Sequence, residues 1–211
     1  MLAKYGSPTP DALCESAMRH VALLEKFDFN DIVISIKSSD VSRMVAAYRK
    51  IATLCDYPLH LGVTEAGTER MALIKSAAGI GALLLDGIGD TIRVSMTADP
   101  VREVAAGFDI LKAVDLKTDC PRIVSCPTCG RTKIDLIGLA NEVERRLQGC
   151  KKPITVAVMG CVVNGPGEAR EADIGIAGGD HCGLLFRHGE ILRKVPEDQI
   201  VDELIAEIDN L

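Results

Sequence analysis

Hydrophobic residues recur along the first half of the chain in two alternating patterns, one typical of helices and one typical of strands. Amphipathic stretches predict helices over residues 10–26, 41–55, 69–85 and 100–114. Short runs rich in β-branched residues lie between them and predict strands over residues 32–36, 59–63 and 91–95. The strands begin about 30 residues apart, which is the spacing of strand–helix units in a (β/α)8 barrel.

Only three such units can be recognised, and three strands cannot close a barrel. An open parallel sheet of three strands would leave its edges exposed. Two interpretations follow: the chain is the C-terminal part of a longer barrel protein, or it is a small open α/β sheet. The spacing of the units favours the first.

The alternation breaks over residues 115–121, where Asp-Leu-Lys-Thr-Asp-Cys-Pro follows neither period, and we place a domain boundary there. Beyond it the pattern predicts strands over 122–125, 154–159, 173–177, 183–187 and 190–194. Helices are expected over 134–148 and from Pro196 onward. The predicted fold class is therefore α/β: residues 1–116 form three C-terminal β/α units of a TIM barrel, and residues 117–211 form a smaller α/β domain.

The net charge and the hydropathy of the chain bear on whether it binds nucleic acid or a membrane. The net charge is −6, whereas general nucleic-acid binders are basic, so we expect no nucleic-acid partner. No apolar run reaches the length of a membrane span, and the N-terminus does not resemble a secretory signal. We therefore expect a cytoplasmic protein without a membrane partner.

Cysteines mark the second domain. Hydrophobic residues make up 47% of the chain, so a sizeable core can form, and the eight cysteines are expected to be thiols or metal ligands rather than disulfides. Cys126 and Cys129 form a C-x-x-C loop after one predicted strand, and Cys161 ends the next. Because neighbouring parallel strands end at the same edge of a sheet, the three thiols can converge. Thiolates suit iron–sulfur clusters or zinc.

Three interpretations of these thiols remain open. A structural zinc site needs four ligands, and Cys182 or His181 could supply the fourth, but the second C-x-x-C of a zinc ribbon is missing. A redox dithiol would leave Cys161 without a role. A cluster accounts for all three thiols. The Asn-Gly-Pro-Gly turn after Cys161 could also bring Glu168 to the metal, although a lone glutamate is more often a surface carboxylate.

Strand parity suggests a second site in the first domain. In the strand 91–95, Arg93 and Ser95 share one face and the apolar residues between them share the other. The apolar face should pack on the helices, so Arg93 and Ser95 should point into the barrel mouth. Lys37 follows the first strand with matching parity, and the three together could bind a diphosphate. His60 is expected to be a packing residue.

The motifs as a whole resemble one family. Cys-Pro-Thr-Cys-Gly-Arg and Gly-Cys-Val-Val-Asn-Gly-Pro-Gly-Glu-Ala closely resemble the cysteine motifs of the 4-hydroxy-3-methylbut-2-enyl diphosphate synthases, iron–sulfur enzymes of the non-mevalonate isoprenoid pathway. Likeness extends to Ser-Ala-Met-Arg-His, Leu-Gly-Val-Thr-Glu-Ala-Gly and Asp-Gly-Ile-Gly-Asp-Thr-Ile-Arg-Val-Ser, so it covers essentially the whole chain.

The resemblance implies a [4Fe–4S] cluster held by Cys126, Cys129, Cys161 and Glu168 in the C-terminal domain. It implies an oxidoreductase that opens 2-C-methyl-D-erythritol 2,4-cyclodiphosphate by two-electron reduction, with loss of water, to 4-hydroxy-3-methylbut-2-enyl diphosphate. Reduced ferredoxin or flavodoxin would donate the electrons. The family works as a homodimer in which the cluster domain of one chain caps the barrel of the other.

The resemblance also assigns substrate residues. It implies substrate contacts for Lys37, Glu65, Arg93 and Ser95, and a catalytic proton transfer for Glu65 near the departing hydroxyl. Compared with a (β/α)8 barrel, about five strands are missing. We therefore expect the chain alone to be an incomplete and inactive form.

Overall fold

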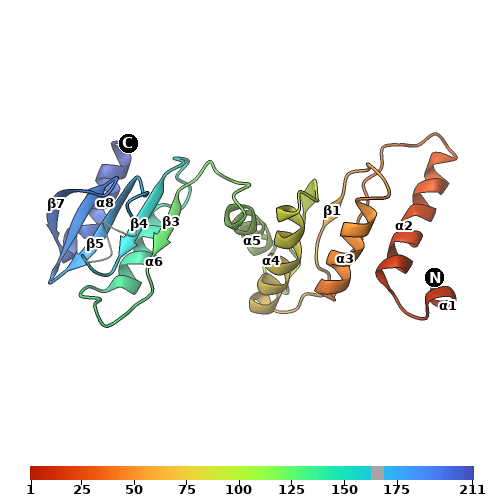
Figure 1. Ribbon diagram of the computed structural model, residues 1–211, viewed down its shortest axis with the longest axis horizontal. Coiled ribbons are helices and arrows are strands. Elements are labelled where there is room, and N and C mark those ends of the chain that lie inside the picture. The colour runs from red at the N-terminus through yellow and green to blue at the C-terminus, as the bar shows by residue number, and fades with distance from the viewer. Residues whose placement is uncertain (163–168) are drawn as a thin grey trace. The chain divides into compact units, whose positions relative to one another are not determined.

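The computed structural model describes residues 1–162 and 169–211 (Figure 1). The chain divides into two compact units, Met1–Lys117 and Thr118–Leu211. Each unit contains both helices and strands, so the fold class is α/β, as predicted. Among the helices of the described ranges, none combines the length and the apolar character that a membrane crossing needs.

The first unit is built on helices, and the four longest pack side by side in chain order (Figure 1). The helices are α1 (Leu2–Tyr5), α2 (Pro10–Glu25), α3 (Val41–Ile51), α4 (Glu69–Leu85) and α5 (Pro100–Ala113). Thr9, Asp40 and Asp99 precede α2, α3 and α5, and their side-chain oxygens accept hydrogen bonds from amides of the first turn. These caps satisfy amides that have no partner within the helix, and they explain where the helices begin.

Helix α3 ends four residues earlier than the apolar pattern predicts. The Thr53 hydroxyl donates a hydrogen bond to the Lys50 carbonyl (2.8 Å), and the Cys55 thiol donates to the Ile51 carbonyl (3.8 Å). These side chains satisfy carbonyls of the last turn, so the helix can stop there. Cys55 consequently lies beyond the helix, half-buried, and not within it.

Three extended segments run parallel beneath these helices. Strands β1 (His60–Leu61) and β2 (Thr91–Ile92) pair in parallel. The segment 32–38 joins β1 through isolated parallel bridges, Ile34 to Leu59 and Ser38 to Val63. All three predicted strands are therefore extended and parallel, but their regular ladders are shorter than the sequence predicts.

The buried side chain of Tyr48 explains the interrupted ladder between the first two segments. Its hydroxyl accepts a hydrogen bond from the amide of Ile36 (2.9 Å) and donates one to the carbonyl of His60. In an uninterrupted parallel ladder this amide would bond to that carbonyl directly. The hydroxyl is inserted between them, so a side chain of α3 bridges the two segments.

We expect Tyr48→Phe to destabilise the first unit by about 1–3 kcal/mol, because it leaves a buried amide and a buried carbonyl without their shared partner. Tyr57→Phe is the matched control, since the Tyr57 hydroxyl bonds to Glu25 at an exposed position and its loss should cost less than about 0.5 kcal/mol. Hydrogen exchange of the buried amides in the first unit measures both effects. Equal losses in the two variants would contradict a bridging role for Tyr48.

In its described residues, the second unit is a five-stranded sheet with two helices on one face. Its strands, in spatial order, are β3 (Arg122–Ser125), β4 (Thr155–Met159), β5 (Ile174–Gly179), β6 (Cys182–Arg187) and β7 (Glu190–Pro196). The first three are parallel, and β5, β6 and β7 pair antiparallel. The helices are α6 (Leu136–Arg146) and α8 (Ile200–Asp209), the latter preceded by the 3-10 turn η1 (Glu197–Gln199).

Alternation along β4 and β5 divides the core of this unit between the two faces of the sheet. Val156 and Val158 belong to the larger apolar cluster with residues of α6 and α8, whereas Ala157 and Met159 belong to a second cluster with Phe186. Both faces are therefore covered, which is why β4 is a continuous apolar run in the sequence. The carboxyl ends of β3 and β4 lie together at one edge of the sheet, and this edge carries the cysteine loops.

Candidate functional site

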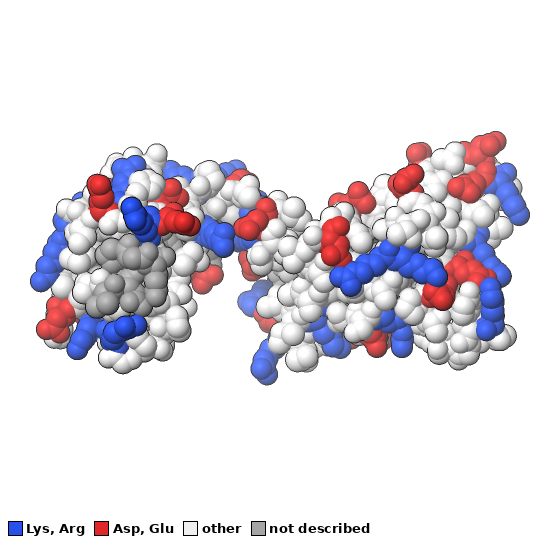
Figure 2. Space-filling model, in the orientation of Figure 1, with Lys and Arg blue, Asp and Glu red and all other residues white. Residues whose placement is uncertain are grey.

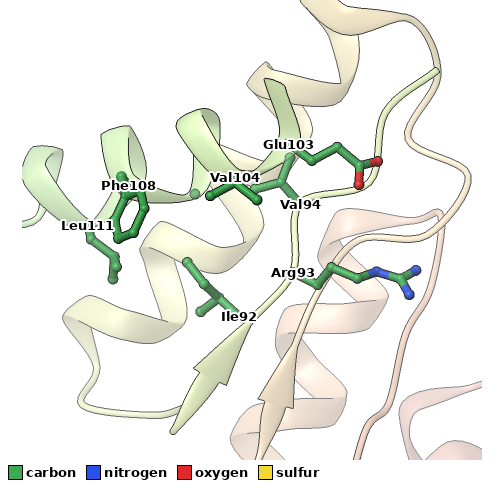
Figure 3. A pocket seen from close by; sticks show the side chains of 8 residues that line it. Ile92, Arg93, Val94, Glu103, Val104, Phe108 and Leu111 are labelled. Carbon is green, nitrogen blue, oxygen red and sulfur yellow. The ribbon is translucent and has the colours of Figure 1, made fainter. Parts of the chain in front are cut away.

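The polar residues of the first unit lie on the face of the sheet that its helices leave open. Figure 3 shows Ile92 directed toward α5, while the Arg93 side chain extends away from it. The Nε and Nη2 groups of Arg93 donate hydrogen bonds to the Ser95 hydroxyl at 3.1 and 3.0 Å. Ser95 thus orients the guanidinium on the open face. Figure 2 shows acidic and basic side chains interspersed over the visible surface, so positive charge for an anion must be local.

Lys37 reaches the same face across Gly62. A Cβ atom added to Gly62 would lie 3.1 Å from Lys37 Cε, 3.3 Å from Lys37 Nζ and 2.9 Å from the Arg93 carbonyl oxygen. The absence of a side chain at Gly62 therefore makes room for the lysine. Partial burial, and then the charge of Arg93, lower the pKa of Lys37. Two cationic groups therefore lie near each other on this face, and each disfavours the charged form of the other.

We expect Gly62→Ala to weaken the binding of inorganic pyrophosphate about tenfold, equivalent to about 1.4 kcal/mol, because the methyl group would meet both the Lys37 side chain and the Arg93 carbonyl oxygen and displace the two basic residues. Gly81→Ala is the matched control: its new Cβ would meet only Val114 Cγ1, at an ordinary 3.8 Å. Because Gly81 lies inside α4, that control should stabilise the helix by about 0.5–1 kcal/mol and leave binding unchanged. Titration followed by NMR measures both. Unchanged affinity in Gly62→Ala would show that Lys37 does not need this gap.

Glu65 lies at a left-handed turn where the second extended segment ends. Its φ is 50°, a conformation that residues other than glycine rarely adopt. Regular strand parity would have placed Glu65 on the side of Leu61 and Val63, but this turn redirects it. Glu65, Arg93 and Ser95 now line one hollow of about 310 Å³. A carboxylate and a guanidinium therefore face the same small space.

Glu103 also lines this hollow, and nothing in the sequence analysis pointed to it. Its carboxylate accepts a hydrogen bond from the amide of Met96 at 2.8 Å. That contact fixes the loop after Ser95 against α5, so Glu103 holds the wall of the hollow in place. Such a role depends on a contact between a helix and a loop, which hydrophobic periodicity does not report.

Two cysteine segments meet at the edge of the second sheet. Ser125 at the end of β3 pairs with Val158 near the end of β4, so the residues that follow both strands are neighbours. The amide of Gly160 donates a hydrogen bond to Cys126 Sγ at 3.2 Å. Cys161 is buried, with 6% of its surface exposed, and Cys126 is half-buried. The structure therefore brings the segments of Cys126 and Cys161 together.

Cys129 is exposed in the loop between β3 and α6. Its amide donates to the Thr132 hydroxyl at 3.2 Å, and the Thr132 amide donates to the Cys129 carbonyl at 3.0 Å, which closes a tight turn. The backbone amide of Arg131, and then its side chain, lower the pKa of the Cys129 thiol. The turn therefore favours the thiolate, the form that binds metals.

The three cysteines predicted as metal ligands are not gathered around one point in the part of the chain that the structure describes. Within residues 1–162 and 169–211, no three Cys, His, Asp or Glu side chains form a group that could hold a metal ion. Glu168, the predicted fourth ligand, lies outside the described residues. In the described part of the site, the segments of Cys126 and Cys161 are in contact at the edge of the sheet. Cys129, three residues after Cys126, is exposed to solvent.

Cys182 is a further thiol close to this edge. It begins β6 and pairs with Gly179, and a Cβ added to Gly179 would lie 2.8 Å from Cys182 Sγ and 3.8 Å from Val162 Cγ1. The buried thiol of Cys182 therefore lies beside the segment that carries Cys161. The register of the hairpin between β5 and β6 creates this proximity, and spacing along the sequence could not show it.

Two family descriptions match the chain. Residues 1–108 match the GcpE TIM-barrel domain, and residues 122–210 match the GcpE protein C-terminal domain. The chain belongs to the GcpE family. The family resemblance recognised in the two cysteine motifs is therefore confirmed.

Curated proteins are similar in sequence to this chain over its whole length. The 4-hydroxy-3-methylbut-2-en-1-yl diphosphate synthase (flavodoxin) of Clostridium perfringens (strain 13 / Type A) is 62% identical over 211 residues, and that of Geobacter sulfurreducens is 61% identical. Each match covers 100% of this chain and 60% of the relative. The corresponding protein of Anoxybacillus flavithermus is 57% identical and is covered to 58%. The chain thus spans about 60% of the length of these relatives.

Proposed function

We propose that this chain is part of a cluster-dependent oxidoreductase that converts 2-C-methyl-D-erythritol 2,4-cyclodiphosphate to 4-hydroxy-3-methylbut-2-enyl diphosphate. The reaction is a two-electron reductive ring opening with loss of water. The observation that carries the proposal is the contact between the Cys126 and Cys161 segments at one edge of a parallel sheet. The names of the relatives, at 57–62% identity, support the same reaction.

The donor set fits a [4Fe–4S] cluster held by Cys126, Cys129, Cys161 and Glu168. Thiolates are soft ligands that suit iron–sulfur clusters, and an amide such as that of Gly160 stabilises the charge on a ligating sulfur. A carboxylate is a harder and weaker partner, so the position held by Glu168 would be open to exchange. When bound, such a cluster supplies electrons one at a time.

The residues of the first unit would bind and orient the substrate. Lys37 and Arg93 would neutralise the diphosphate, and Ser95 holds the Arg93 guanidinium in position. Glu65 would transfer a proton near the departing hydroxyl, from the hollow that it shares with Arg93. Residues 1–116 would therefore be the substrate side, as the last three β/α units of a TIM barrel, and residues 117–211 would be the cluster domain.

The proposed partners follow from the same reaction. Reduced flavodoxin is the favoured electron donor, because the relatives carry it in their names, and ferredoxin is the alternative. A homodimer would let the cluster domain of one chain cap the barrel of the other. We propose a cytoplasmic location, in keeping with a diphosphate substrate and a small electron-carrier protein.

We expect Lys37→Ala and Arg93→Ala each to weaken pyrophosphate binding by about 1.5–3 kcal/mol, because each removes one charge-assisted contact. Neither should change the iron content, since both residues belong to the first unit. Lys112→Ala is the control, because Lys112 is exposed and paired with Asp109. Unchanged pyrophosphate affinity in both variants would mean that these side chains merely face solvent.

Turnover tests the proposed function directly. The 211-residue chain alone should not convert the cyclodiphosphate, because the barrel is incomplete. The same chain joined to the part of the Clostridium perfringens relative that it does not match should do so with reduced flavodoxin. An inactive chimera that nevertheless carries its cluster would contradict the proposed reaction. Full activity of the chain alone would contradict the need for further barrel units.

A further inference from the structure

His60 lies on the same open face as Lys37 and Arg93, which corrects the expectation that it is a packing residue. It pairs with Thr91 in the parallel register of β1 and β2. Arg93 follows Thr91 by two positions, so the two basic side chains lie in successive layers, about 7 Å apart along the strand direction. The His60 side chain is half-buried rather than enclosed by the apolar core.

Hydrogen bonds fix both the backbone and the ring of His60. The hydroxyls of Ser35 (3.2 Å) and Tyr48 donate to its carbonyl oxygen. The ring nitrogen Nδ1 lies 2.8 Å from Thr91 Oγ1. With Nδ1 engaged by Thr91, Nε2 is the nitrogen left to face a ligand.

The charges around His60 are positive. Burial, and then the charges of Lys37 and Arg93, lower the pKa of His60. The other groups that face it, Ser35 on the first segment and Thr91 on β2, are neutral hydroxyls. The carboxylate of Asp90 is engaged by the amide of Leu59 at 2.7 Å. His60 is therefore neutral at neutral pH while the face is empty, and a dianionic ligand beside Lys37 and Arg93 would reverse that balance.

We propose that His60 is a third cationic residue of the diphosphate site and that it takes up a proton from solvent when the ligand binds. This inference rests on the proposed function, in that Lys37 and Arg93 must bind the diphosphate. In the tautomer that we propose, Nδ1–H donates to Thr91 Oγ1, so the incoming proton adds to the lone pair of Nε2. Because the ligand raises the pKa of His60, protonation and binding favour each other, and affinity rises as pH falls through the bound-state pKa.

NMR of the 211-residue chain tests this with inorganic pyrophosphate as the probe. The imidazole signals of the four histidines are followed from pH 5 to pH 8.5 with and without ligand. We expect the pKa of His60 to rise by about one unit, which corresponds to a tenfold coupling. His188 is the internal control, because it lies exposed in the turn between β6 and β7 of the second unit and should not respond.

The His60→Asn variant separates coupling from simple attraction. In the parent chain, the affinity for pyrophosphate should rise between pH 8 and pH 6 by more than the protonation of pyrophosphate alone explains. The His60→Asn variant should lack this additional rise. An unchanged His60 pKa in the parent chain, with Lys37 and Arg93 signals still perturbed by pyrophosphate, would overturn the proposal and leave the diphosphate site intact. Absence of any pyrophosphate binding would overturn both the role of His60 and the diphosphate site. Iron counting would still decide separately whether the chain binds a cluster. If His60→Asn fails to fold, the pKa measured in the parent chain decides.

Discussion

Cys161→Ser is expected to remove most of the iron from the anaerobically reconstituted chain. Cys161 is buried directly after β4, beside the amide that donates to Cys126 Sγ. A serine hydroxyl is harder, and it stays protonated at neutral pH, so it replaces a thiolate poorly at iron. Cys126→Ser and Cys129→Ser should have the same effect. Iron and sulfide per chain, together with the broad visible absorbance of iron–sulfur charge transfer, measure the loss.

Cys150→Ser is the matched control for these substitutions. Cys150 is half-buried in the same unit and precedes β4, whereas Cys161 follows it, so the two thiols lie at opposite ends of one strand. Its substitution should leave the iron content at the parent value. Full iron retention in Cys161→Ser, or an equal loss in Cys150→Ser, would contradict the assignment of the cluster to this sheet edge.

The two substitutions of Glu168 should act in opposite directions on the metal. Glu168→Cys is expected to keep a four-iron cluster, because thiolate is the better-matched ligand, yet to abolish turnover in the chimera by closing the exchangeable position. Glu168→Ala should make one iron labile, so that a three-iron form appears on oxidation. Electron paramagnetic resonance distinguishes the two forms.

Glu171→Ala provides the control for Glu168, since Glu171 is an exposed carboxylate three positions further along the chain. Its spectrum should match that of the parent chain. If Glu168→Ala and Glu168→Cys also gave the parent spectrum, then Glu168 would be a surface carboxylate and not a ligand.

Elements with strong local signals could be predicted from the sequence. Helix α4 covers Glu69–Leu85 and β3 covers Arg122–Ser125, as the hydrophobic pattern predicts. The interrupted ladder near Ile36 could not be predicted, because it depends on the Tyr48 hydroxyl reaching it from another element. Periodicity reports which face of an element is buried, and it carries no information on a side chain inserted between two strands.

In the candidate site, too, features set within one element could be predicted, and features set by contacts between elements could not. Parity predicted that Arg93 and Ser95 share the face opposite the helices, and it depends only on the geometry of one strand. The packing role expected for His60 was wrong, because one ring among apolar neighbours gives no sign of Thr91 on the adjacent strand. The turn that redirects Glu65 requires a left-handed conformation that nothing in its residue type indicates.

Metal and sulfide analysis of the anaerobically reconstituted 211-residue chain, combined with electron paramagnetic resonance of the reduced sample, decides whether the second unit binds a [4Fe–4S] cluster. We expect a brown protein with about four iron and four sulfide per chain and the signal of a reduced [4Fe–4S] cluster. A colourless protein that holds one zinc and no sulfide would contradict this expectation.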